Sequence, residues 1–183
     1  MRIPPFRPEH LTPDQQAVYD AVTGGPRARG PQLFPLTTDD GSLRGPFNAL
    51  LLAPAIGGAL QELGSAIRYR GALDDRSREI AILLVAARWR SEFEQVSHEA
   101  IARSLGFDDA QLAGLAREDL RGLSDRERVV ADTVRALLDG DLDDDAWRRA
   151  EHGLGAPTVF ELTTLVGYYS TLALQLRVFR VGV

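Results

Sequence analysis

The sequence predicts an all-α protein, a compact bundle of about seven to eight helices with a long N-terminal loop. Three observations predict this fold class. Apolar residues recur at helical spacing along most of the chain. No segment alternates apolar and polar residues in the way a half-buried strand does. Ser, Thr and Asp residues stand where helices would begin, and glycines stand where several would end.

The N-terminal part of the chain is predicted to be an arm, one short helix and a loop. Thr12 is a suitable N-cap, Pro13 suits the first helical position, and Gln15 completes a capping box, so a helix is expected to about Val22. The segment 24–46 is rich in Gly, Pro, Asp and Thr, which predicts a long loop. Loops of this length usually act as lids or subunit contacts.

Residues 54–69 form the next predicted helix, and one apolar stripe of it is expected to face the core. The residues of this stripe are Ile56, Leu60, Leu63 and Ile67. Arg68 and Arg70 lie at the C-terminal end, where cations interact favourably with the helix dipole. Arg70 has a second interpretation as a residue that holds a substrate carboxylate, and the sequence leaves both open.

The centre of the bundle is predicted to be a helix over residues 75–90. Its run from Ile80 to Ala87 is apolar on every face, which is typical of a helix buried all round. Ser91 and Glu94 then have the spacing of a capping box, so a new helix is expected to begin at Ser91. Gly106 is expected to end it.

Four further helices complete the prediction. A short amphipathic helix covers 108–117, and a capping box opens the helix 124–138. The acidic run 143–145 begins another helix, and its charges are interpreted as first-turn carboxylates rather than as metal ligands. The last helix covers 158–179. Its apolar residues are expected to be buried, namely Phe160, Leu162, Leu165, Val166, Leu172, Leu176 and Phe179.

Length and composition limit the function classes. A chain of 183 residues suits one domain, here an arm over 1–45 and a helical core over 46–183. The absence of cysteine excludes disulfides, thiolate catalysis and zinc–thiolate sites. With a net charge of −5 and scattered arginines, neither nucleic acid nor an anionic membrane is expected as a partner. The N-terminus lacks the apolar core of a secretory signal, so a cytoplasmic location is expected.

The strongest chemical signal lies in the segment 89–98. At about 3.6 residues per turn, Glu94 and His98 fall on the same helix face as the apolar residues of the following turns. Burial of ionisable groups costs several kcal/mol unless they are paired or face a wet cavity. A small polar pocket is therefore predicted beside them. His10 and His152 lie in polar segments and are interpreted as surface residues.

The same residues also have a purely structural interpretation. Ser91 and Glu94 would then be a capping pair, and His98 a buried histidine that forms a hydrogen bond. A glutamate and a histidine one turn apart supply two metal ligands but no third, so no metal site is expected. A serine triad is disfavoured because neither Ser91 nor Ser97 lies in a G-x-S-x-G elbow.

Several separated motifs, occurring in the expected order, resemble the carboxymuconolactone decarboxylase and alkylhydroperoxidase D superfamily. They cover residues 73–82, 91–100 and 104–106. Residues 165–170 resemble the final helix of longer, cysteine-free members, and residues 45–49 resemble their upstream pocket segment. The resemblance implies the helical bundle of that superfamily. It also implies that Phe47, Asn48 and Tyr168 bind substrate.

In the peroxidase branch of that superfamily, a glutamate precedes a CxxC motif at a helix start, and a histidine follows four residues after the second cysteine. The glutamate corresponds to Glu79, the two cysteines to Ser91 and Glu94, and the histidine to His98. A hydroxyl and a carboxylate cannot form a disulfide, so thiol peroxidase activity is not expected. The decarboxylase branch also lacks the cysteines, but it tends to have a small polar residue in place of Glu79.

The residues and the resemblance together predict a cofactor-free acid–base enzyme for a small carbonyl, lactone or carboxylate substrate. His98, tuned by Glu94, would move a proton, and Glu79 would relay it. Arg70 or the helix start at Ser91 would hold an anionic group. The alternative is a non-catalytic protein of the same fold that binds a ligand or forms an oligomeric scaffold. The resemblance implies a homo-oligomer, a dimer or trimer, and the other expected partner is a small-molecule substrate.

Overall fold

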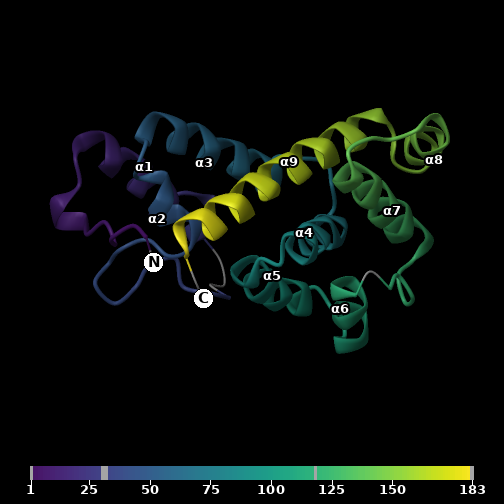
Figure 1. Ribbon diagram of the computed structural model, residues 1–183, viewed down its shortest axis with the longest axis horizontal. Coiled ribbons are helices and arrows are strands. Elements are labelled where there is room, and N and C mark those ends of the chain that lie inside the picture. The colour runs from purple at the N-terminus through teal and green to yellow at the C-terminus, as the bar shows by residue number, and fades with distance from the viewer. Residues whose placement is uncertain (1, 30–32, 118, 182–183) are drawn as a thin grey trace. The chain divides into compact units, whose positions relative to one another are not determined.

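A computed structural model of the chain describes residues 2–29, 33–117 and 119–181. In these residues the regular structure consists of nine α-helices and two 3₁₀ turns (Figure 1). β pairing within them is limited to an isolated bridge between Thr37 and Leu43. The predicted all-α fold class is confirmed. No helix among the described residues is long and apolar enough to cross a bilayer.

The chain divides into two compact units, each described by itself. The first comprises Met1–Arg70 with Leu174–Val183, and the second comprises Gly71–Ala173. The long helix α9 (Ala156–Phe179) contributes to both units. The single domain expected from the sequence stays a prediction.

The first unit is built on three helices and two short turns. They are η1 (Pro8–His10), α1 (Pro13–Thr23), η2 (Pro26–Ala28), α2 (Pro46–Leu50) and α3 (Pro54–Tyr69). The capping box of Thr12 and Gln15 forms as predicted. The predicted loop 24–46 contains η2 and the isolated bridge, and its residues 30–32 lie outside the described part. The sequence did not predict α2, whose five residues are all buried.

The orientation of α3 differs from the prediction. Ile56 and Leu63 were expected to face the core, but their side chains are 65% and 37% exposed. The residues that are buried on this helix are Gly57, Gln61, Gly64 and Ser65. Gly57 explains the difference, because a Cβ atom added there would clash with the carbonyl oxygen of Leu50. The close approach of the α2 backbone therefore sets which face of α3 turns inward.

The second unit is built around α4. Its helices are α4 (Asp75–Trp89), α5 (Glu92–Ser104), α6 (Asp109–Ala116), α7 (Asp125–Asp139), α8 (Asp144–Leu154) and the first part of α9. Helix α4 contacts α5, α6 and α7, and every residue from Ser77 to Ala86 is buried (Figure 1). The prediction of a central, fully buried helix is confirmed.

Most predicted helix ends in this unit are confirmed. Asp108 and Ser124 form capping boxes at the starts of α6 and α7. Gly106 and Gly140 have the positive φ angles of residues that follow a helix. The first member of the acidic run, Asp143, accepts a hydrogen bond from the backbone of the first turn of α8, so this carboxylate caps the helix.

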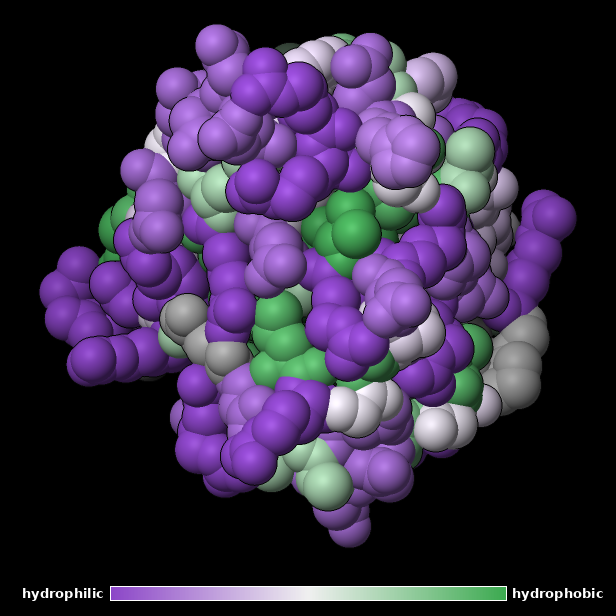
Figure 2. Space-filling model, turned by 90° about the vertical axis from the view of Figure 1, so that its right-hand side faces the viewer, coloured by the Kyte–Doolittle hydropathy of each residue, from purple (hydrophilic) through white to green (hydrophobic). Residues whose placement is uncertain are grey.

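Helix α9 begins two residues earlier than predicted, at Ala156. Five of its predicted core residues are buried, namely Leu162, Leu165, Val166, Leu172 and Leu176. Phe160 is 72% exposed, so its predicted burial is wrong. It lies out of phase with the buried positions Val159 and Leu162 at helical spacing. Phe179 is only partly buried. The face of the molecule at the α8 end is mostly polar, with small apolar patches (Figure 2).

Arg76 of α4 connects three parts of the second unit. Its Nε donates to Glu127 Oε1 of α7 at 2.7 Å, and its Nη1 donates to the carbonyl oxygen of Leu105 at 3.1 Å. The guanidinium also stacks on the ring of Phe107. Partial burial raises the pKa of Glu127, but hydrogen bonds from Ser124 and Arg76 lower it more, so this pKa lies below its usual value.

We expect the variant Glu127→Gln to lose about 1–2 kcal/mol of unfolding free energy at pH 7, because hydrogen bonds to charged groups contribute about this much. The pKa of Glu127 is lower in the folded state, so its stabilisation is present above about pH 4.3, the usual value in an unfolded chain. It is lost as the pH falls through the folded-state pKa. Urea denaturation at neutral and acidic pH measures both effects.

The variant Asp139→Asn is the matched control, because Asp139 also connects α7 to α4, through Arg88 at 2.8 Å. Both side chains are about half or more exposed, at 68% and 49%. Exposed pairs contribute about 0–1 kcal/mol, so little change is expected at any pH. An equal loss in both variants at pH 7 would contradict the special role of Glu127.

Candidate functional site

Three ionisable side chains meet between α4 and α5. Glu79 comes from the buried centre of α4, and Glu94 and His98 come from one face of α5. Their side chains are buried, with exposed fractions of 0%, 3% and 5%. The predicted inward orientation of Glu94 and His98 is therefore confirmed. Their catalytic roles stay predictions, as does the pocket beside them.

The imidazole of His98 has a carboxylate at each ring nitrogen. Nδ1 lies 2.5 Å from Glu79 Oε2, and Nε2 lies 3.4 Å from Glu94 Oε2. A neutral imidazole donates from one nitrogen and accepts at the other, whereas an imidazolium donates from both. A proton that arrives at one nitrogen can therefore be passed on from the other. The arrangement is suited to moving protons between two acids.

The two carboxylates face different nitrogens of the ring, so they do not converge on one position for a metal ion. An ion bound to one nitrogen would be near one of the carboxylates only. Among the described residues, no group of three or more His, Asp and Glu side chains is arranged to hold a metal ion.

Ser91 occupies the N-cap position of α5, but the predicted capping box does not form. Its backbone N–H donates instead to the carbonyl oxygen of Ala86 at 2.9 Å, across the end of α4. This donor is therefore occupied, and the carboxylate of Glu94 turns to His98. Ser91 Oγ and Glu94 Oε1 are buried and have no hydrogen-bond partner among the described residues.

These two atoms lie close together in the sequence, at the start of α5. A buried polar atom without a partner typically costs about 1–3 kcal/mol. A folded protein keeps such atoms only where something else satisfies them or where function requires them. Ser91 and Glu94 are three positions apart on one helix, so they lie on the same side of it. They are candidates for contact with a ligand.

A tyrosine pair from α9 completes the surroundings of His98. The ring of Tyr169 meets the imidazole edge to face, with centroids 5.3 Å apart. Tyr168 packs edge to face on Tyr169 at 5.2 Å, and both tyrosines are buried. The role of Tyr168 in substrate binding stays a prediction. Tyr169, which the sequence did not single out, contacts the histidine.

A further functional candidate, Glu161 of α9, was not predicted. Its carboxylate accepts hydrogen bonds from the backbone N–H groups of Ala72 at 2.8 Å and Leu73 at 2.9 Å. These residues immediately precede α4, which carries Glu79. Glu161 therefore ties α9 to the start of α4 and is a positioning residue. The signal in the sequence was its position directly before residues 162–176, which carry no charged side chain.

The remaining predicted substrate-binding residues belong to the first unit. Phe47 packs in the core of that unit with five other residues. Asn48 accepts a hydrogen bond from the N–H of Phe6 at 2.9 Å and donates to the carbonyl of Pro4 at 3.1 Å, so it holds the N-terminal arm. Arg70 pairs with Glu62 on α3. Their roles in substrate binding stay predictions.

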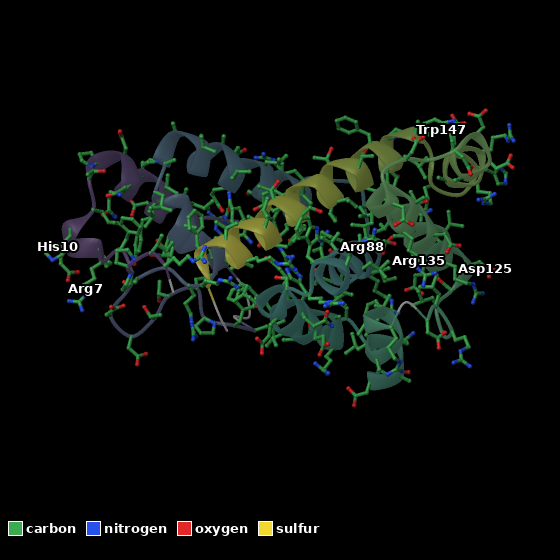
Figure 3. All side chains as sticks on the ribbon, in the orientation of Figure 1. Arg7, His10, Arg88, Asp125, Arg135 and Trp147 are labelled. Atoms are coloured by element: carbon green, nitrogen blue, oxygen red, sulfur yellow. The ribbon has the colours of Figure 1, made fainter. Side chains whose placement is uncertain are left out.

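The other two histidines lie at the surface, as interpreted from the sequence. His10 is exposed in η1, where Figure 3 labels it, and His152 is exposed in the last turn of α8. Within the second unit, the structure thus brings together Glu79, Glu94 and His98. It adds Tyr169 to this group.

Comparisons with known proteins agree with this architecture. Residues 54–121 match the model of the carboxymuconolactone decarboxylase family. The fold is similar to a crystal structure described as an alkylhydroperoxidase AhpD core, an uncharacterized peroxidase-related protein from Ralstonia eutropha JMP134. That similarity has a TM-score of 0.78 at 16% identity and covers 99% of this chain and 90% of that one.

A second similar structure is that of the debrominase Bmp8 in complex with 2,3,4-tribromopyrrole. It has a TM-score of 0.72 at 12% identity, and the match covers 100% of this chain and 91% of that one. At these identities the structural similarities show a shared fold. No protein with a curated description matches the sequence.

Proposed function

We propose that this chain, in which residues 54–121 match the carboxymuconolactone decarboxylase family and which shares the fold of an alkylhydroperoxidase AhpD core, is a cofactor-free acid–base enzyme. Its substrate would be a small carbonyl, lactone or carboxylate compound, and the reaction a decarboxylation or a proton transfer. The observation that carries the proposal is the buried imidazole of His98 between the carboxylates of Glu79 and Glu94.

Each residue of this group has a distinct proposed role. Glu94 has the free oxygen, so it contacts the substrate and exchanges a proton with it. His98 exchanges that proton through Nε2, and Glu79 holds the other ring nitrogen and accepts or returns the proton there. In a proton transfer, the proton leaves a carbon next to a carbonyl group and returns to another position. In a decarboxylation, the relay protonates the carbon that loses carbon dioxide.

Neither of the activities named for the two similar structures is proposed for this chain. The sequence contains no cysteine, so a peroxidase cycle through a dithiol and a disulfide has no sulfur to use. The ligand named for the debrominase structure is a small ring compound. This supports a small-molecule substrate rather than a macromolecule.

The variant Glu94→Gln tests the proposal. Removing the proton acceptor is expected to slow the reaction about 10²-fold or more, because a positioned acid or base typically contributes about 10²–10⁴-fold. The measurement is proton–deuterium exchange at carbons next to carbonyl groups, followed by ¹H NMR on a panel of small ketones and lactones in D₂O.

Glu92→Gln is the matched control, because Glu92 is in the same helical turn but is exposed. It should exchange protons at the wild-type rate. Exchange by Glu94→Gln at that same rate would contradict the proposed role. Binding of panel compounds without any exchange by the wild type would favour the non-catalytic alternative.

A further inference from the structure

Two buried polar atoms at the start of α5 are available to a ligand. Ser91 Oγ and Glu94 Oε1 have no hydrogen-bond partner among the described residues, and their side chains are 9% and 3% exposed. The second oxygen of Glu94 faces His98 Nε2 at 3.4 Å. One carboxylate oxygen and one hydroxyl are thus left to a ligand. Ser91 is the N-cap of α5, and Glu94 lies in its first turn.

The hydrogen-bonding capacity of the Glu94 carboxylate limits the kind of group that can bind there. An ionised carboxylate oxygen only accepts hydrogen bonds, so the ligand must supply an O–H or N–H donor. The backbone N–H of Ser91, which a capping box would direct to Glu94, already donates to the carbonyl oxygen of Ala86. A carboxylate ligand would offer only acceptors, and its charge would repel the charge of Glu94 more strongly in a buried site than in water.

The partial positive charge at the N-terminus of α5 attracts an anion, but this attraction is weaker than the repulsion from Glu94. The N-terminus of a helix is equivalent to about half a positive charge, whereas ionised Glu94 carries a full negative charge. The sum of these two charges at the first turn of α5 is therefore negative. This differs from the expectation that the Ser91 helix start holds an anionic group. The buried carboxylate at Glu94 is the reason for the difference.

We propose that Ser91 and Glu94 bind a neutral ligand that carries a hydroxyl donor next to a carbonyl acceptor, as in a hydroxy ketone or an enol. Glu94 Oε1 accepts from the ligand hydroxyl, and Ser91 Oγ donates to the ligand carbonyl. Taking this ligand as the substrate class rests on the proposed function. The carbonyl group makes the neighbouring C–H acidic, which suits a site built to transfer protons.

Three small probes of similar size separate the possibilities. Acetoin is neutral and has a hydroxyl next to a carbonyl, 2-butanone lacks the hydroxyl, and lactate replaces one methyl group of acetoin with a negatively charged oxygen. Binding is measured at pH 7 by ¹H–¹⁵N NMR titration of the whole protein. We expect acetoin to bind about tenfold more tightly than 2-butanone, the effect of one hydrogen bond to a charged group. We expect a preference of about tenfold over lactate as well, because lactate keeps the hydroxyl but its charge is repelled by Glu94.

Two variants connect the preference to the named atoms. Glu94→Gln removes the negative charge, so the preference for acetoin over lactate should fall to less than about threefold. Ser91→Ala removes the hydroxyl, so acetoin should bind about threefold to tenfold more weakly. The control Glu92→Gln should keep the wild-type preference. The NMR spectra also report whether each variant is folded, and either variant alone is sufficient for the test.

Several results would overturn the proposal. They are tighter binding of lactate than of acetoin by the wild type, no binding of any probe, an unchanged preference in folded Glu94→Gln, or an unchanged affinity for acetoin in folded Ser91→Ala. These results are distinct from failure of the proposed function. A preference for acetoin without catalysed exchange would support the ligand class and reject the enzyme. Catalysed exchange that depends on Glu94, with lactate as the preferred ligand, would support the enzyme and reject the ligand class.

Discussion

Replacement of His98 with glutamine is expected to reduce catalysed proton exchange by about 10²–10⁴-fold. Glutamine has a similar length and can form hydrogen bonds, but its amide cannot take up and release a proton near neutral pH. His98 lies between Glu79 and Glu94, so its loss separates the two acids. The measurement is kcat and KM for the best substrate of the exchange panel. The loss should appear mainly in kcat.

The pH dependence gives a second measurement on the same protein. The three groups are close enough to exchange protons as one coupled unit, so the wild type should show a bell-shaped dependence of kcat/KM on pH. This shape should disappear in His98→Gln. A bell-shaped profile with the same two limbs in the variant would show that other groups are responsible.

His152→Gln is the matched control for this substitution, since the same change is made at an exposed histidine of α8. It should retain wild-type kcat and pH dependence. A lower melting temperature of His98→Gln is also expected, because Glu79 loses the partner that faces it at 2.5 Å. A lower melting temperature with unchanged turnover would favour the structural interpretation of His98.

Replacement of Gly57 with alanine is expected to cause a large loss of stability, about 1–3 kcal/mol or more. The added Cβ atom would meet the carbonyl oxygen and carbon of Leu50, which are backbone atoms and cannot rotate away. To relieve the clash, α2 and α3 would have to move apart. This would disturb the core that contains Leu50 and Phe47. Urea denaturation of the purified protein measures the loss.

The neighbouring variant Gly58→Ala provides the control. A Cβ atom at Gly58 would lie 3.7 Å from Val18 Cγ2, an ordinary contact distance. Alanine also favours the helix over glycine by about 0.5–1 kcal/mol, so this variant should be neutral or slightly stabilised. Equal stability of the two variants would contradict the observed packing of α2 against α3.

Local rules in the sequence were sufficient for much of the fold. Thr12 and Ser124 predicted helix starts because a capping side chain acts on a backbone group within three residues. The apolar run of α4 predicted a central helix because no face of it could be exposed without cost. The inward orientation of Glu94 and His98 also followed from helical spacing alone.

The same rules failed where the end of one helix meets the start of the next. The Ser91 capping box does not form because the carbonyl of Ala86 takes the N–H that Glu94 would have bound. The orientation of α3 follows from Gly57 and the carbonyl of Leu50, not from the apolar stripe. In each case one backbone contact outweighed a side-chain pattern.

The sequence by itself therefore determined the helices other than α2, the buried centre and the presence of an acid and a histidine on one inward face. The tertiary structure alone decided the distances of Glu79 and Glu94 from the two nitrogens of His98, and the contact of Tyr169 with its ring. The physical reason is the distance along the chain over which each effect acts. Capping and helical periodicity act within a few residues, whereas the contacts of a site depend on how separate helices pack.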